Sequence, residues 1–178
     1  MLEFYCRKSK PHLKDLHRKS IEKNIEFKIL IWGDNMEDMI KMLADAPEEQ
    51  RKTMLMERMK MIATQPEDQR LESVKGIVMA ISKLPKDKMK AFIRTRTDAV
   101  LEASDDLRKK IVVARAKISS QIPKEVHEAD MMAIAEYMTK WPKEKLDMVM
   151  SKMAPIYKEA GLPAPDYKSM VEKIKAMN

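Results

Sequence analysis

The chain has 178 residues, with 35 Lys and Arg against 28 Asp and Glu, a formal net charge of +7 and a single Cys. One Cys excludes an intramolecular disulfide and a cysteine-rich metal site, and three Gly leave little for a glycine-rich phosphate-binding loop. No apolar run approaches the ~20 residues of a membrane-spanning helix. The start of the chain also lacks a secretory pattern, so we expect a cytoplasmic protein without a membrane partner.

Residues 1–35 differ in composition from residues 36–178. They contain the single Cys, two of the three His and four of the nine aromatic residues, and after the first residue they contain no Met. Two interpretations stay open. The first is a basic helix at residues 13–31 that docks on the rest of the chain. The second is an upstream extension with the natural start at Met36, because the codons shortly before that Met would form a purine-rich run.

Beyond residue 36, a proline recurs at intervals of 19 residues, with one serine in place of the fourth proline. The six residues that start these units are Pro47, Pro66, Pro85, Ser104, Pro123 and Pro142. The acids that follow them by two positions are Glu49, Asp68, Asp87, Asp106, Glu125 and Glu144. Every unit is apolar eight and fourteen positions after its start, which is compatible with one stripe along a helix. A fixed period of this kind predicts a repeat architecture.

Each unit predicts one amphipathic helix of ~14–15 residues. The proline or serine would be the first helical residue and the acid the third, where a carboxylate meets the positive end of the helix dipole. We expect an all-α array of six ~19-residue helical units stacked as αα-hairpins, either solenoid-like or as a compact bundle. A short C-terminal helix at about residues 166–177 closes the array. Residues 36–178 form a single helical-repeat domain in this interpretation.

Two units depart from the pattern. The fourth begins with Ser104, and residues 86–122 contain neither Pro nor Gly. Ser104 favours a new helix because serine is a good N-cap, although one long helix through units three and four is the alternative. In the sixth unit, Pro155 lies deep inside the predicted helix and should kink or end it. Gly161 then offers a C-terminal cap.

The sequence contains no group of residues typical of a catalytic or metal site. Cys6 has no positioned base near it, which thiolate chemistry would need. His127 is the only His of the repeats, and a pairing with Asp130 would be a weak contact on a helix surface. The recurring acids are explained by their places at helix starts. We therefore expect no enzymatic activity, no cofactor and no bound metal.

Methionine is unusually frequent, with 18 residues. The crowded groups are Met54, Met56, Met59 and Met61 in the first unit and Met131, Met132, Met138, Met148, Met150 and Met153 in the last two. Filling of the core is the simplest interpretation, because many of these residues fall on the apolar stripe. The alternatives are a flexible surface that adapts to apolar partners and a thioether site for Cu(I).

Positive charge is concentrated in residues 85–117, which carry ten basic and five acidic side chains. The candidate partner-binding residues there are Lys86, Lys90, Arg94, Arg96, Arg108, Lys109, Lys110, Arg115 and Lys117. A basic face of this kind predicts docking of a protein with an acidic surface. The leading hypothesis is a non-catalytic helical-repeat adaptor or accessory subunit that bridges other subunits into a larger assembly, with a homo-oligomer as a further option.

The same basic segment supports a second hypothesis from another class of function. Lysine and arginine side chains bind the phosphate backbone of RNA or DNA through the release of counterions. Base stacking would add exposed aromatic residues, and the segment contains only Phe92. Binding of Cu(I) or of an apolar peptide by the Met-rich helices is a third, weaker alternative.

Overall fold

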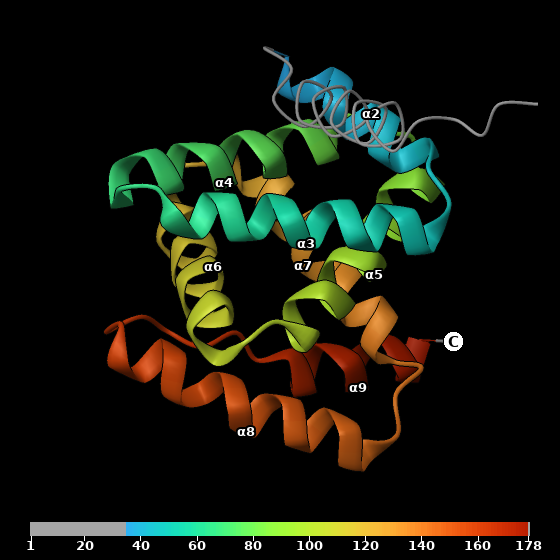
Figure 1. Cartoon of the computed structure of the whole chain (residues 1–178). Coiled ribbons are helices and arrows are strands. Elements are labelled where there is room, and N and C mark those ends of the chain that lie inside the picture. The colour runs from blue at the N-terminus through green and yellow to red at the C-terminus, as the bar shows by residue number, and fades with distance from the viewer. Residues whose placement is uncertain (1–34, 178) are drawn as a thin grey trace, which may run out of the picture. The chain divides into compact units, whose positions relative to one another are not determined.

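The computed structural model describes residues 35–177, and this part of the chain is all-helical (Figure 1). The all-α prediction is confirmed. The predicted helix at residues 13–31 and Cys6 lie outside the described residues. The helices are α2 (Met36–Asp45), α3 (Glu48–Thr64), α4 (Glu67–Ser82), α5 (Lys86–Glu102), α6 (Asp105–Lys117), η1 (Ile118–Ser120), α7 (Lys124–Met138), α8 (Lys143–Glu159) and α9 (Tyr167–Met177).

Helices α3 to α8 correspond one to one to the six units of the repeat, and α9 is the predicted C-terminal helix. Helix α2 precedes the first unit and had no counterpart among the predicted units. Its start is capped by Asn35, whose Oδ1 accepts a hydrogen bond from the backbone N–H of Glu37 at 3.0 Å. Met39, Ile40 and Leu43 are buried on its inner face, so α2 belongs to the same core.

The five prolines stand one residue before their helices as N-cap residues, which corrects the prediction that they are the first helical residues. Pro66, for example, has φ −51° and ψ 153°, an extended conformation. Its carbonyl oxygen still accepts from the backbone N–H of Arg70 at 2.9 Å and closes the first turn. The recurring acid is therefore the second helical residue instead of the third. It remains in the first turn, where the helix dipole favours a negative charge.

Units three and four form two separate helices, as the presence of Ser104 predicts. Helix α5 ends at Glu102, Ala103 is extended with ψ 153°, and the Ser104 Oγ accepts from the backbone N–H of Leu107 at 3.4 Å. The serine thus starts α6 by providing a side-chain acceptor that proline lacks.

Pro155 does not end its helix, which was one of the two predicted effects, because α8 continues to Glu159. A proline removes only one backbone hydrogen bond of the ladder, and in α8 it stands in the last turns, so few following bonds depend on it. The helix ends where Gly161 was predicted to cap it, with φ 65°. The backbone N–H of Leu162 then reaches the carbonyl of Tyr157 at 3.0 Å.

Helices two apart in the chain pack most extensively against one another: α2 with α4, α3 with α5, α4 with α6, α5 with α7, and α7 with α9. Contacts between α3 and α6 and between α4 and α7 join these pairs into one bundle. Of the two predicted forms, a solenoid-like array and a compact bundle, the helices thus adopt the compact bundle. Figure 1 shows α3 and α4 on one side of this bundle and α8 on the opposite side.

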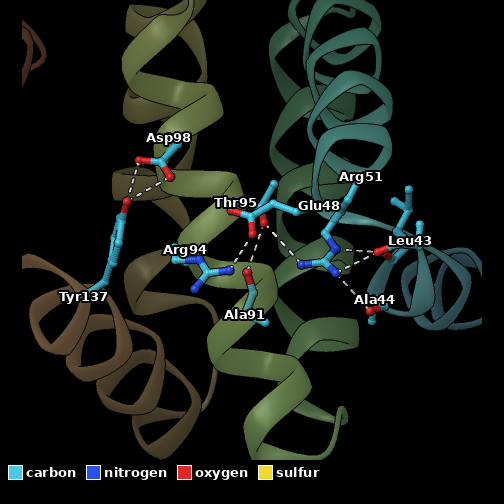
Figure 2. Close-up of polar contacts among 10 residues, drawn as sticks. Leu43, Ala44, Glu48, Arg51, Ala91, Arg94, Thr95, Asp98 and Tyr137 are labelled. Atoms are coloured by element: carbon cyan, nitrogen blue, oxygen red, sulfur yellow. Dashed lines mark hydrogen bonds and ion pairs between the residues drawn. The ribbon is translucent and has the colours of Figure 1, made fainter.

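A buried arginine near the start of α3 fixes the end of α2. Arg51 donates from Nε to the carbonyl of Leu43 at 2.9 Å and from Nη2 to the carbonyls of Ala44 and Ala46 at 3.3 and 2.8 Å. Its Nη1 donates to the Thr95 Oγ1 at 3.2 Å (Figure 2). The guanidinium therefore supplies a charged donor to three carbonyls at and just after the end of α2, and it places a positive charge at the negative end of the helix dipole.

Arg108 repeats this arrangement three units later, between α6 and α5. It donates from Nε to the carbonyl of Val100 at 3.2 Å and from Nη2 to the carbonyls of Leu101 and Ala103 at 2.9 and 2.5 Å. The acceptors lie eight, seven and five residues before the arginine in both cases. Both arginines lie four residues after the start of their units. The side chain at this repeat position thus connects its own helix to the end of the preceding one.

Several hydrophobic clusters make up the core. One joins α7, α8 and α9, with Trp141 and Val171 among its buried members. A second joins α3, α4, α6 and the following η1 segment, and a third joins α3, α5 and α6. Met39, Met54, Met59 and Met138 are buried in the core, which confirms core filling for these four. Met132, Met148 and Met177 are exposed.

Candidate binding sites

The structure separates the nine predicted partner-binding residues into four places. Arg108 is buried and holds the end of α5, so it is not available to a partner, which corrects its assignment to an exposed basic face. Arg96 and Arg115 point inward and pair with the same carboxylate. The six remaining residues are Lys86, Lys90 and Arg94 on α5 and Lys109, Lys110 and Lys117 on α6.

Most of these charges have a carboxylate partner within the described residues. On α5, Lys90 pairs with Glu136 at 2.5 Å and Arg94 with Glu48 at 2.6 Å (Figure 2). The ion pairs of the three lysines on α6 are Lys109–Glu159, Lys110–Asp106 at 3.0 Å and Lys117–Glu67 at 2.5 Å. All of these pairs are at least one-third exposed, and such pairs typically contribute less than ~1 kcal/mol. The ammonium groups can therefore exchange these carboxylates for those of a partner.

A surface groove of about 250 Å³ lies between α4 and α6 and gathers the three lysines of α6. Its other basic residue is Arg70, which donates to the carbonyl of Gln65 at 3.0 Å. Glu67 and Asp106 are its two acids, so the groove keeps an excess of positive charge. The remaining lining residues are Leu71, Val113 and Ala114. The groove thus combines an apolar strip with lysines along it, and no aromatic side chain lines it.

A second, larger space lies inside the bundle. This cavity has a volume of about 310 Å³, and its walls come from α3 to α8 and the start of α9. Its lining is mainly aliphatic and Met side chains, together with Tyr157 and Tyr167. Members of all three hydrophobic clusters face it, so the cavity lies where these clusters would otherwise meet. Small-molecule sites in proteins are typically cavities of ~300–1,000 Å³ with such a lining.

One position of the repeat lines this cavity in all six units. The residues eleven positions after the unit starts are Arg58, Ile77, Arg96, Arg115, Ile134 and Met153. Three of the six are arginines, and the other three are apolar. The apolar stripe was predicted from the residues eight and fourteen positions after each start, and the arginines at position eleven were not recognised as a shared feature. The same alignment of units would have shown that three arginines share one face of the array.

Two of these arginines hold a buried carboxylate in α7. Asp130 accepts from Arg96 Nη2 at 2.8 Å through Oδ1, and from Arg115 Nη2 at 2.8 Å and Nε at 3.1 Å through Oδ2. Burial alone would raise the pKa of Asp130, but the charges and hydrogen bonds of Arg96 and Arg115 outweigh it and hold that pKa below its ordinary 3.8. Asp130 is therefore ionised at neutral pH.

His127 belongs to the same network and not to a surface pair with Asp130. Its Nδ1 accepts a hydrogen bond from Arg115 Nη2 at 3.2 Å, which requires the neutral ring with the proton on Nε2. Burial and then the charge of Arg115 lower the pKa of His127 below 6.5, and neighbouring acids only partly offset this. The histidine is thus neutral at pH 7, with one of its ring nitrogens in a structural hydrogen bond.

The third arginine, Arg58, lies on α3 and lines the cavity beside Leu55, Met59 and Ile62. Burial lowers the pKa of its guanidinium, because apolar surroundings disfavour a charge. Burial also raises the pKa of Tyr157 and Tyr167, so both phenols stay protonated at neutral pH. The Tyr167 hydroxyl donates to the sulfur of Met131 at 3.2 Å.

Within residues 35–177, His, Asp and Glu side chains form no group of three or more arranged to hold a metal ion. In the same part of the chain, none of the helices has both the length and the apolar character of a membrane span. A scan against models of protein families finds no match, and neither a search of curated proteins nor one of solved structures finds a similar chain. The observations on this chain that bear on function are therefore the groove and the cavity.

Proposed function

We propose that the protein is a non-catalytic helical adaptor that binds an acidic segment of another protein in the groove between α4 and α6. The observation that carries the proposal is the convergence of Lys109, Lys110 and Lys117 with Arg70 on one groove. In such an adaptor, the bundle is the scaffold and the groove is its docking surface. An accessory subunit that bridges larger components would work in the same way.

Three features favour an acidic peptide over a nucleic acid. The groove contains Glu67 and Asp106, which would repel a continuous phosphate backbone but leave room for separated carboxylates. It offers no aromatic ring on which a base could stack. Its floor of Leu71, Val113 and Ala114 suits apolar side chains placed between acids. The expected ligand is a short segment rich in Glu or Asp with one or two aliphatic residues.

A comparison of two probes of equal charge tests this proposal. Isothermal titration calorimetry with the full chain would compare a short Glu-rich peptide carrying central Leu residues with a single-stranded oligouridylate of the same net charge. We expect saturable binding of the peptide and weaker binding of the RNA at the same salt concentration. Tighter binding of the RNA, with an affinity that falls steeply as salt rises, would replace the adaptor by a nucleic-acid-binding protein.

A further inference from the structure

The central cavity carries an inference that is independent of the adaptor proposal. We propose that it binds an uncharged, mainly apolar small molecule of about ten to twelve carbon atoms, held by one hydrogen bond to the Tyr157 hydroxyl. No part of this proposal involves a chemical reaction. It concerns a resident or regulatory ligand inside the bundle.

The volume of the cavity sets the size of this ligand. An apolar cavity of ~150 Å³ inside a protein stays dry and binds benzene. The central cavity has about 310 Å³, roughly twice that space. A molecule of about ten to twelve carbon atoms, such as one with two fused rings, therefore fits it. Met59, Met138, Met150 and Met153 line the space, and their flexible side chains adjust to ligands of different shape.

The wall that α8 contributes to the cavity leaves apolar surface uncovered. The buried residues of α8 are Leu146 and Val149. Met150, Met153 and Tyr157 line the cavity from the same helix and are only half-buried. Apolar surface left in contact with water is unfavourable, and a ligand that covers it gains the corresponding free energy. The free energy of binding therefore comes mainly from apolar contacts along this wall.

The two tyrosines of the cavity differ in their hydrogen bonds. The Tyr167 hydroxyl donates to the sulfur of Met131 at 3.2 Å. The Tyr157 hydroxyl has no hydrogen-bond partner among residues 35–177. Burial raises the pKa of Tyr157, and the charge of Arg115, which lines the same cavity, opposes this only in part. The hydroxyl thus stays protonated at neutral pH and can donate to a hydroxyl or carbonyl oxygen of a ligand.

The charged groups at the cavity favour an uncharged ligand over an anion. Arg96 and Arg115 share Asp130, and Arg58 has an interaction partner of its own. An anion would have to compete with these partners, and it would also have to leave water for mainly apolar surroundings, which is unfavourable. A neutral molecule with one hydrogen-bonding oxygen avoids both costs.

Calorimetric titration of the full chain with naphthalene, 2-naphthol and 2-naphthoate tests this inference, because the three molecules share one ring system and differ in a single group. We expect saturable binding of naphthalene and of 2-naphthol. The affinity for 2-naphthol should be higher by about fivefold, because it gains one hydrogen bond. The affinity for 2-naphthoate should be the lowest of the three, because its carboxylate must leave water.

Two matched variants locate the hydrogen bond. Tyr157→Phe should remove the preference for 2-naphthol and leave the affinity for naphthalene unchanged. Tyr167→Phe is the control: this tyrosine lines the same cavity, but its hydroxyl already bonds to Met131, so the variant should keep the preference. Ile134→Trp should fill the cavity and abolish binding of both molecules.

Four results would overturn the inference: no saturable binding of 2-naphthol, equal affinities for 2-naphthol and naphthalene, tighter binding of 2-naphthoate than of 2-naphthol, or equal behaviour of the Tyr157→Phe and Tyr167→Phe variants. Circular dichroism of each variant reports whether the helices are retained. If a variant fails to fold, the comparison of the three probes on the unaltered chain still decides between a neutral ligand with one polar group, a purely apolar ligand and an anion.

Discussion

Arg96 and Arg115 are 19 residues apart, one repeat unit, and both donate to the carboxylate of Asp130 at 2.8 Å. The repeat thus places two equivalent side chains from α5 and α6 on opposite oxygens of one acid in α7. The Asp130 side chain is only 5% exposed, so this pairing stabilises the junction of three helices in a region that water barely reaches. It also sets the charge along one wall of the central cavity.

Replacing Asp130 by Asn should destabilise the protein strongly. Loss of the negative charge leaves two half-buried guanidinium groups without their shared counterion, which typically costs about 3–5 kcal/mol. Chemical denaturation followed by circular dichroism would measure the loss. Asp147→Asn is the control, because Asp147 pairs with Lys168 in an exposed position and its removal should change little. Equal losses for both variants would show that the Asp130 network contributes no special stability.

The network also predicts a pH dependence. The pKa of Asp130 is lower in the folded state than its ordinary value of 3.8. The resulting stabilisation is fully present above the unfolded pKa and is lost as the pH falls below about 4 toward the folded pKa. Denaturation series between pH 2 and pH 7 should therefore show a steeper acid loss for the unaltered chain than for Asp130→Asn. Parallel curves for the two proteins would contradict the assignment.

The arginines that hold helix ends should matter in proportion to the carbonyls they bind. Arg51→Met and Arg108→Met each leave three backbone carbonyls without their charged donor and should each cost at least about 2 kcal/mol. Arg70 holds the same repeat position but donates to a single carbonyl, that of Gln65. Arg70→Met should therefore cost less than about 1 kcal/mol. A loss for Arg70→Met as large as for the other two would show that the carbonyl bonds are not the cause.

The serine that replaces the fourth proline offers a test of the repeat itself. Ser104→Ala removes the hydroxyl that caps α6 and should cost about 1 kcal/mol. Ser104→Pro also removes the hydroxyl, but φ −58° at Ser104 and the extended Ala103 before it suit a proline. Because proline restricts the unfolded chain, this variant should be more stable than Ser104→Ala by about 0.5–1 kcal/mol. The reverse order would mean that unit four does not share the start geometry of the others.

The period of the prolines was enough to predict the number and place of the six helices α3 to α8. The separate start at Ser104 and the cap at Gly161 followed from local chemistry. The continuation of α8 through Pro155 could not be predicted from local chemistry, because the loss of one backbone hydrogen bond is offset by the rest of the helix. Helix α2 was not predicted either, because it is shorter than a unit and precedes the first proline of the repeat.

The candidate sites were harder to predict from the sequence, because charge along a chain does not reveal which way a side chain points. Arg108 counted as part of a basic face but points inward to the end of α5. Lys109 and Lys110 follow it directly and line the groove between α4 and α6. The cavity arginines shared a repeat position that alignment of the units could have shown. Their convergence around one space required the packing of helices two apart in the chain.

The adaptor proposal is tested most directly by reversing charge at two places in matched variants. One variant changes Lys109, Lys110 and Lys117 in the groove to Glu, and the other changes Lys86, Lys88 and Lys90 on α5 to Glu. Both variants alter the net charge equally, so a difference between them reports position and not total charge. We predict that the groove variant loses binding of the Glu-rich peptide while the α5 variant keeps it. Equal loss in both variants, or none in either, would contradict the assignment of the groove as the docking surface.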